Sequence, residues 1–317
     1  IVRNGKTQGD TTVGIDMVAT WTPGDVNAMN GRGGVTIIST KKYASVMPNI
    51  TITCKKFLND NRTAIEGMIA AIAQAGDQVR SFDDVKKYAC TLNAEIWDEQ
   101  TGDYWYKYYN GVKVDNNTQL GGSMVFNLAD MSKMFGLNGS PDVYKEIYNT
   151  FGKLQSKLYP KDLPEIVEYS KAVDKSFLMT VVSNHPELLE GKSLEVDYSD
   201  QITSTVSSKD VHINFEFGSA NISASSTETL LDLYSSAITS EGLKLGIYGH
   251  TDNVGNPEAN RALSLARAQA VKNFLVKKGI PAQRIEVQGF GEDEPIQDNN
   301  TEAGRAANRR VQIKLGN

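Results

Sequence analysis

Residues 243–279 decide the fold of the C-terminal part and read LKLGIYGHTDNVGNPEANRALSLARAQAVKNFLVKKG. The apolar run Leu243–Gly249 predicts a buried strand. This strand leads directly into His250, Thr251 and Asp252. The sequence therefore places a carboxylate at the end of a buried strand, just before the next element begins.

That next element is a long helix whose two ends are marked by their residue types. Asn256 is a typical cap, Pro257 suits the first helical position, and Gly279 follows the end, which predicts a helix over Pro257–Lys278. Four of its residues define the expected apolar face: Leu263, Ala266, Ala270 and Phe274.

Arg267 lies about 40° from Leu263 around this helix, inside the apolar face, and Asn260 shares its line. An unpaired charge on a core-facing surface costs several kcal/mol, so Arg267 needs an anionic partner. Asp252 is the nearest candidate in the predicted fold. The residues alone leave two interpretations open, a structural ion pair and a ligand clamp.

The other elements of residues 211–317 complete a small α+β domain. Strands are expected at His212–Phe217, Arg284–Gln288 and Arg309–Leu315, and a helix at Ala224–Thr239. The order βαβαββ predicts a mixed sheet with helices packed against it.

Several motifs in this region carry a family resemblance. Residues 249–255 (GHTDNVG), 260–268 (NRALSLARA), 289–292 (GFGE) with Pro295, and 304–311 (GRAANRRV) are similar to the signature of OmpA-like peptidoglycan-binding domains. The match covers about residues 211–316, in order and at the family's spacing.

The resemblance implies a non-catalytic module that grips the meso-diaminopimelate of an uncrosslinked peptidoglycan stem peptide. Its acid and base correspond to Asp252 and Arg267. Diaminopimelate ends in an ammonium and a carboxylate on one carbon, which an acid beside an arginine fork can recognise together. Five further residues would line or brace the pocket: Thr251, Asn260, Leu263, Asn308 and Arg309.

One position departs from the family pattern. Where the family often has Asp or Asn after its first strand, Phe215-Glu216-Phe217 is followed here by Gly218. We therefore expect a polar side-chain contact to be missing on that wall of the pocket.

Residues 1–190 predict an α/β unit with strands early and helices late. The expected strands are Val13–Trp21, Val35–Ser39 and Ile50–Cys54. Helices are expected at Arg62–Ala75, Asn127–Phe135, Pro141–Leu158 and Pro164–Asn184. A further helix is expected to begin at a capping box formed by Ser81 and Asp84. Its apolar stripe consists of Val85, Tyr88, Ala89, Leu92 and Ile96. Residues 191–210 are rich in Ser, Thr and Asp and predict a linker.

This unit also carries a resemblance. Residues 14–23 (GIDMVATWTP), Ser39-Thr40-Lys41 and residues 55–61 (KKFLNDN) are similar to the later part of a bilobal periplasmic solute-binding protein. The nearest type is the sulfonate, nitrate or taurine receptor, here fused to an OmpA-like module. The resemblance covers about residues 10–180 and implies an incomplete domain whose first lobe begins elsewhere, in a companion chain or in a longer protein.

Aromatic residues of the N-terminal unit are candidates for contact with a solute or a partner. Thr20 and Trp21 lie at an expected strand end, and Trp105 belongs to the aromatic run Tyr104–Tyr109. A core position for Trp21 and a packed seam for the run are the alternative interpretations.

Composition and motifs argue against several classes of protein. The net charge of −5 and the pI near 5.4 exclude a typical nucleic-acid binder. No apolar run approaches the roughly 20 residues that a membrane helix needs. The three histidines lack the spacing of metal ligands, and Gly31–Gly34 lacks the features of a phosphate loop. We therefore expect a protein that is not an enzyme and that binds no cofactor and no metal.

The two cysteines give little information about compartment. Cys54 shares the alternation of Ile50 and Ile52 and is expected to point inward, whereas Cys90 lies off the apolar face of its helix. We interpret both as unbridged residues.

The sequence therefore predicts a non-catalytic protein of a Gram-negative-type periplasm or cell envelope, anchored to peptidoglycan by residues 211–317. One alternative is a wall-tethered solute receptor of an ABC-type importer, which binds a small anionic solute. Another is a wall-bound structural subunit of an envelope machine, whose N-terminal domain docks a companion protein chain.

Overall fold

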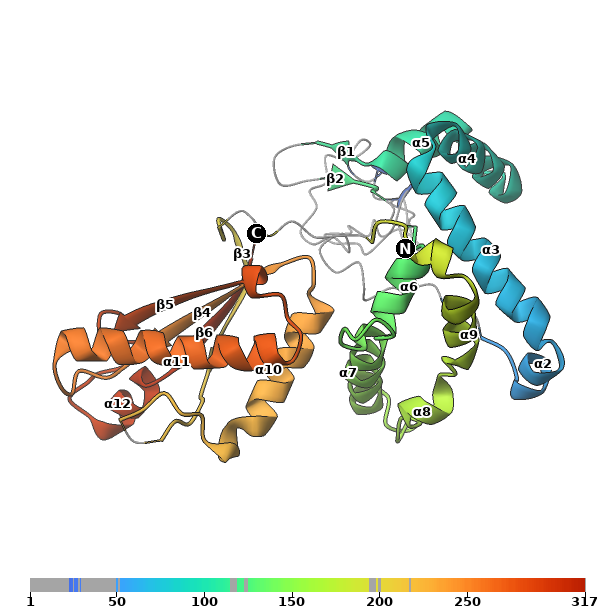
Figure 1. Ribbon diagram of the computed structural model, residues 1–317. Helices are drawn as coiled ribbons and strands as arrows, with labels where there is room; N and C mark the ends of the chain where they lie inside the picture. Colours follow the sequence, from blue (N-terminus) through green and yellow to red (C-terminus); the bar gives the residue numbers. More distant parts are fainter. Residues whose placement is uncertain are drawn as a thin grey trace, which may run out of the picture. The chain divides into compact units, whose positions relative to one another are not determined.

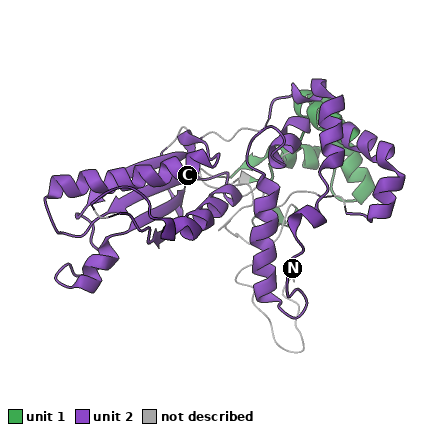
Figure 2. Ribbon diagram, turned by 60° about the horizontal axis from the view of Figure 1, so that its bottom comes forward, with its two compact units in different colours: residues 1–39, 71–127 green, residues 40–70, 128–317 purple. Residues whose placement is uncertain are grey.

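The computed structural model describes residues 23, 24, 26, 27, 29, 50, 52–114, 119–122, 125–193, 198, 201–216 and 218–316. The chain divides into two compact units, residues 1–39 with 71–127 and residues 40–70 with 128–317 (Figure 2). The predicted strands Val13–Trp21 and Val35–Ser39 lie outside the described residues. The predicted domain boundaries at 190 and 211 stay a prediction.

Helices dominate the described residues between 52 and 190. They are α2 (Lys55–Asp60), α3 (Arg62–Ser81), α4 (Asp83–Trp97), α5 (Gly102–Asn110), α6 (Leu128–Met134), α7 (Val143–Leu158), α8 (Tyr169–Ala172), α9 (Ser176–Asn184) and the short η2 (Pro186–Leu189) (Figure 1). Two short strands, β1 (Val112–Lys113) and β2 (Gln119–Leu120), pair in an antiparallel manner. Within the part of the chain that is described, no helix has both the length and the apolar composition to span a bilayer.

Three of the expected helices form close to where the sequence places them. Helix α3 begins at Arg62 as expected and continues to Ser81, while α6 and α7 match the predicted ranges within two residues at each end. The single helix Pro164–Asn184 was wrong, because Val173 is extended between α8 and α9 (φ −119°, ψ 120°). The Asp174 side chain accepts a hydrogen bond from the Ser176 backbone N–H and so starts α9 anew.

The predicted strand Ile50–Cys54 was wrong. Its described residues carry no strand pairing, Ile52 is 84% exposed, and Cys54 precedes α2 as an exposed residue. Alternation of apolar residues gives a buried face only where a neighbouring strand supplies hydrogen bonds. Cys90, which we expected off the apolar face, is buried, and Cys54, which we expected to point inward, is exposed.

The start and the apolar stripe of α4 also differ from the prediction. Ser81 ends α3, and Phe82 caps α4 without a side-chain hydrogen bond, so the capping box does not form. Tyr88 and Ile96 of the predicted stripe are 64% and 72% exposed. Helix α4 packs on α5 through another face, where Gly102 lies so close to Thr91 that a β-carbon would come within 2.7 Å of the Thr91 hydroxyl.

The C-terminal region contains a four-stranded mixed sheet in the order β3-β6-β4-β5. Its elements are β3 (Thr205–Val211), η3 (Ala224–Ser226), α10 (Thr227–Thr239), β4 (Lys244–His250), α11 (Pro257–Lys277), η4 (Ala282–Arg284), β5 (Ile285–Gly291), α12 (Glu302–Asn308) and β6 (Val311–Gly316) (Figure 1). Strand β4 runs parallel to β5 and antiparallel to β6, with Ile247 opposite both Val287 and Ile313. The predicted mixed sheet is confirmed.

The first strand of this sheet lies earlier than expected. Strand β3 begins inside the predicted linker, and the predicted strand His212–Phe217 is reduced to an isolated bridge between Phe215 and Ile222. Strand β3 is an edge strand whose first six residues are exposed. Because most of β3 is exposed, its sequence TVSSKDV does not alternate between apolar and polar residues. This alternation is the signal that predicts a half-buried strand, so the sequence did not reveal β3.

Helix α11 lies along the sheet and packs on β4 and β5 (Figure 1). Its buried residues are Asn260, Ser264, Ala268, Val271 and Leu275. The predicted face around Leu263 and Phe274 was therefore wrong.

The small size of Ser264 and Ala268 lets the helix approach two glycines of the sheet. A β-carbon on Gly249 would lie 2.1 Å from the Ser264 carbonyl oxygen, and one on Gly289 would lie 2.5 Å from the Leu265 backbone nitrogen. The contact face is set by close backbone approach and not by the largest apolar side chains.

Candidate functional site

Asp252 lies just beyond the end of β4, where the chain leaves the sheet. The His250 N–H donates to the Arg310 carbonyl at 3.0 Å, and the Thr251 N–H donates to the Gly291 carbonyl at 2.8 Å. These bonds connect the end of β4 to Gly291 of β5 and to Arg310, just before β6. They fix the path of the backbone that leads to Asp252. Asp252 itself is buried.

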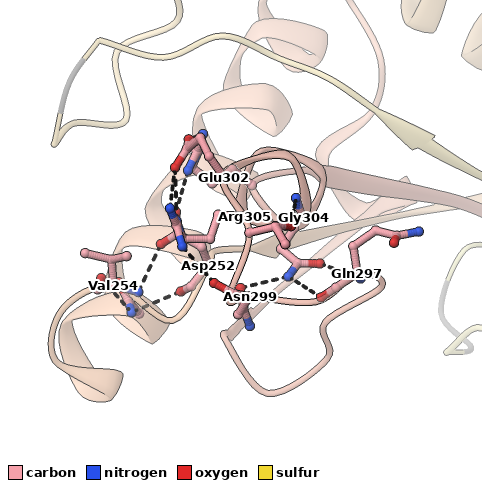
Figure 3. Close-up of polar contacts among 11 residues, drawn as sticks. Asp252, Val254, Gln297, Asn299, Glu302, Gly304 and Arg305 are labelled. Carbon is pink, nitrogen blue, oxygen red and sulfur yellow. Dashed lines mark hydrogen bonds and ion pairs between the residues drawn. The ribbon is translucent and has the colours of Figure 1, made fainter.

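The carboxylate of Asp252 makes two contacts within the domain (Figure 3). One oxygen accepts from the Val254 N–H at 3.1 Å, and the other accepts from Nη1 of Arg309 at 2.6 Å. Asp252 and Arg267 form no direct ion pair in the described part of the chain. Arg309, expected only to line or brace the pocket, is the residue that neutralises Asp252.

Arg309 extends this contact into a chain of alternating charges that reaches α12. Its Nη2 donates to Glu302 at 2.9 Å, and Arg305 donates to the other oxygen of Glu302 at 2.8 Å (Figure 3). The hydrogen bond to Asp252, followed by that to Glu302, raises the pKa of Arg309. The bonds from Arg309 and Arg305 lower the pKa of Glu302.

The sequence reasoning missed Glu302. The available signal was its position: it follows Thr301, whose hydroxyl accepts from the Gly304 N–H and caps α12. An acidic residue in the first turn after such a cap is a common feature of helix starts.

Arg267 is half-buried and is held by contacts other than a carboxylate. Its Nε donates to the Ser219 carbonyl at 3.2 Å, and its guanidinium carbon lies 5.0 Å from the centre of the Phe215 ring. Burial lowers the pKa of Arg267, and the negative charge of Asp252 acts in the opposite direction. Asp252 is thus near enough to influence Arg267 without bonding to it.

A pocket of about 550 Å³ lies beside these two arginines. Arg267 and Arg309 line it, together with Phe215 and the alanines Ala303, Ala306 and Ala307 of α12. A cationic rim over small apolar side chains suits a ligand that carries a carboxylate on a hydrocarbon stem.

Asn260 and Asn308 brace the loops around this pocket. The Asn260 amide donates to the carbonyls of Asp252 and Val254, both at 3.3 Å, and to Glu292 at 2.7 Å. The Asn308 side chain is fully buried and makes four hydrogen bonds in the segment after β5: it accepts from the N–H groups of Ile296 and Gln297, and donates to the Gln297 carbonyl and to Asn299.

Two polar side chains beside Asp252 are buried without a hydrogen-bond partner within the described residues: both ring nitrogens of His250 and the hydroxyl of Thr251. The His250 ring lies flat on Phe290, with the ring centres 5.3 Å apart. Burial, followed by the charge of Arg310, lowers the pKa of His250 to about 4. The imidazole is therefore neutral near pH 7.

Gly218 adopts a left-handed backbone with φ of +65°. Gly, Asn and Asp are the residues that enter this region most readily. The next residue, Ser219, offers its carbonyl to Arg267. Leu263 is half-buried.

Of the candidates in the N-terminal unit, Thr20 and Trp21 lie outside the described residues. Trp105 packs edge-on against Tyr104, with ring centres 5.6 Å apart, and its indole N–H donates to the Glu99 carbonyl at 2.8 Å. Tyr108 is buried in a small core with Leu120. Tyr104, Trp105, Tyr106 and Tyr109 are half-buried. A contact of this aromatic run with a solute or a partner stays a prediction.

A search of the described residues for three or more His, Cys, Asp or Glu side chains able to hold one metal ion finds no such group.

Comparisons with known proteins place the C-terminal region in a class. Residues 214–309 match the model of the OmpA family. The chain is 37% identical over 106 residues to outer membrane porin F of Pseudomonas fluorescens, a match that covers 33% of this chain and 32% of that protein. It is 32% identical over 100 residues to the peptidoglycan-associated lipoprotein of Pseudomonas aeruginosa, covering 32% of this chain and 59% of that protein.

The crystal structure of the peptidoglycan-associated lipoprotein from Burkholderia pseudomallei is 27% identical, with a TM-score of 0.31, and covers 32% of this chain and 87% of that chain. The matches to the curated relatives span about a third of porin F and about three fifths of the lipoprotein. The C-terminal domain of this protein is OmpA-like. The resemblance of the N-terminal unit to solute-binding proteins stays a prediction.

Proposed function

We propose that this chain is a non-catalytic anchor of the Gram-negative-type cell envelope that binds peptidoglycan through its OmpA-like domain. The observation that carries the proposal is the half-buried Arg267 at a pocket that is also lined by Arg309, which is bonded to Asp252. The match of residues 214–309 to the OmpA family and the name of the related peptidoglycan-associated lipoprotein support it.

The ligand that fits this arrangement is the free end of meso-diaminopimelate in a stem peptide. Its carboxylate would bind the terminal nitrogens of Arg267 in a bidentate manner. Its ammonium would bind Asp252, because a carboxylate has about four lone-pair positions and Val254 and Arg309 use two of them. The hydrocarbon stem would lie over the alanines of α12.

The test is co-sedimentation of the full 317-residue chain with purified Gram-negative sacculi. We expect wild type to pellet, and Arg267→Ala and Asp252→Ala to remain in the supernatant. Arg261→Ala is the matched control, because Arg261 lies on the same helix, its side chain is 66% exposed and it pairs with Asp293 at the surface. Circular dichroism of each variant checks the fold.

A soluble stem tripeptide that ends in meso-diaminopimelate should release the pelleted protein, whereas the same tripeptide with lysine in place of diaminopimelate, whose free side-chain end has an ammonium but no carboxylate, should not. Sedimentation of Arg267→Ala at the wild-type level would overturn the assignment of the clamp. A wild-type chain that stays in the supernatant would overturn the anchoring function itself.

A further inference from the structure

The two charged groups of the site are held by different means in the free protein. Asp252 is held by an ion pair with Arg309, whereas Arg267 contacts a backbone carbonyl and an aromatic ring. No acceptor for Nη1 or Nη2 of Arg267 is found in the described part of the chain. Among the described residues, Nε alone makes a hydrogen bond, so the guanidinium fork is available at the pocket that Arg267 lines.

Arg267 is held beside Phe215, Glu216 and residues 218–222. Phe215 and Ile222 form a β-bridge, the Glu216 N–H donates to the Asn221 carbonyl at 2.9 Å, and the Ser219 N–H donates to the Glu216 carbonyl at 3.1 Å. The positive φ of Gly218 turns the chain so that the Ser219 carbonyl meets Arg267.

The base of this turn is fixed to the domain by buried bonds. The Asn214 N–H donates to the hydroxyl of Ser226 at 2.7 Å, and Ser226 is 1% exposed. The Ser223 N–H donates to the Asn214 carbonyl at 2.8 Å. The turn is therefore tied at both ends, which is what a support for a ligand-binding side chain requires.

We propose that Phe215 and the Gly218 turn are positioning residues that pre-set the Arg267 fork for its anionic ligand. This inference rests on the proposed peptidoglycan-binding function. The ring face attracts the guanidinium, the Ser219 carbonyl fixes the Nε edge, and the terminal nitrogens are left for a carboxylate. Less side-chain freedom then remains to be lost when the ligand binds, which increases affinity.

The test is isothermal titration calorimetry of the full chain with a soluble stem tripeptide that ends in meso-diaminopimelate. We expect Phe215→Leu to weaken binding about tenfold, because leucine fills similar space without an aromatic face. Phe215→Tyr keeps the ring and should bind as wild type does. Phe274→Leu is the matched control. The Phe274 ring lies farther along α11, with the Lys278 ammonium 5.9 Å from its centre, so the loss of this ring should leave the dissociation constant unchanged.

A second pair of variants tests the turn without touching the ring. A β-carbon at Gly218 would meet no atom within 4 Å, so a substitution there acts through the backbone alone. Asn tolerates a positive φ and should keep the wild-type dissociation constant, whereas Val does not and should weaken binding several-fold. The Nε–H resonance of Arg267 should shift in Phe215→Leu and in Gly218→Val, and stay in place in Phe215→Tyr and Gly218→Asn.

The outcomes separate this inference from the proposed function. If wild type does not bind the tripeptide, the proposed function fails. If wild type binds, Arg267→Ala abolishes binding, and Phe215→Leu and Gly218→Val bind as wild type does, the clamp stands and the positioning role is overturned. If Phe215→Leu unfolds, the Gly218 pair decides alone: equal affinities of Gly218→Val and Gly218→Asn overturn the inference, and the expected difference supports it.

Discussion

Strand β4 and helix α4 are both rich in apolar residues, yet they differ sharply in burial. In β4, six of the seven residues are buried. In α4, all fifteen residues of which are described, Cys90 alone is buried, and Tyr88, Ile96 and Trp97 are exposed. The two elements thus convert similar composition into opposite structural outcomes.

The difference lies in the partners of each element. Strand β4 is hydrogen-bonded to β5 and β6 along its edges and is covered by α11 on one face. Helix α4 packs mainly on α5. Apolar periodicity shows which side chains are able to be buried, but the neighbours available in the fold determine which of them are.

The largest effect on stability is expected from a substitution that forces α11 away from the sheet. Gly249→Val places atoms against the Ser264 carbonyl, so we expect a loss of about 3 kcal/mol or more in the free energy of unfolding. Urea unfolding followed by far-ultraviolet circular dichroism measures this loss. All three tryptophans precede residue 191, so tryptophan emission reports the N-terminal region separately and should change little.

Gly67→Ala in α3 is the control for that substitution. A β-carbon there meets no atom within 4 Å, and alanine favours a helix by about 1 kcal/mol over glycine. A Gly249→Val chain as stable as wild type would show that the close helix–sheet approach is not needed.

Asn308→Ala should have the next largest effect. It leaves the buried N–H groups of Ile296 and Gln297 without their acceptor, which costs about 2 kcal/mol. Asn308→Asp keeps both acceptor bonds, but it buries a carboxylate oxygen against the Gln297 carbonyl and the Asn299 side-chain oxygen, which the wild-type amide bonds as a donor. We therefore expect a loss at least as large as in Asn308→Ala. The same urea titration measures both variants, and wild-type stability of either one would contradict the bracing role of Asn308.

Stability should also depend on pH through His250. The pKa of His250 is about 4 in the folded protein and near 6.5 when unfolded. Between these values the unfolded chain binds a proton that the folded protein does not, so stability falls as the pH drops from about 6.5 to about 4.

Denaturation midpoints measured across this pH range test that expectation. His250→Phe should flatten the slope, whereas His212→Gln, at an exposed position, should leave it unchanged. A slope that persists in His250→Phe would assign the pH dependence to other groups.

The smallest effect is expected in α4. Ile96→Ser removes an apolar side chain that is 72% exposed, so we expect a change within about 0.5 kcal/mol in the free energy of unfolding. Thermal unfolding followed by tryptophan emission is a suitable measurement. A loss of about 2 kcal/mol or more would show that the Ile96 side chain is covered in solution. The contrast between α4 and β4 would then lie in which partner covers α4.

The end signals of helices were the part of the fold that local sequence described best. The cap at Asn256, with Pro257 at the first position, placed the start of α11 correctly, because the cap bonds the N–H groups of Glu258 and Ala259 within its own turn. The capping box at Ser81 failed because α3 continued through it. A local signal is decisive only where no longer element overrides it.

The sequence by itself placed Asp252 just after β4 and Arg267 on α11, and it predicted that the strands form a mixed sheet. It could do so because strand periodicity, helix caps and motif spacing are local properties of the chain. Which face α11 buries, and which arginine neutralises Asp252, were decided by tertiary structure. Helix α11 buries Asn260, Ser264, Ala268, Val271 and Leu275, and its backbone comes close to the sheet at Gly249 and Gly289. Arg309 reached Asp252 from 57 residues away, a distance that no local pattern encodes.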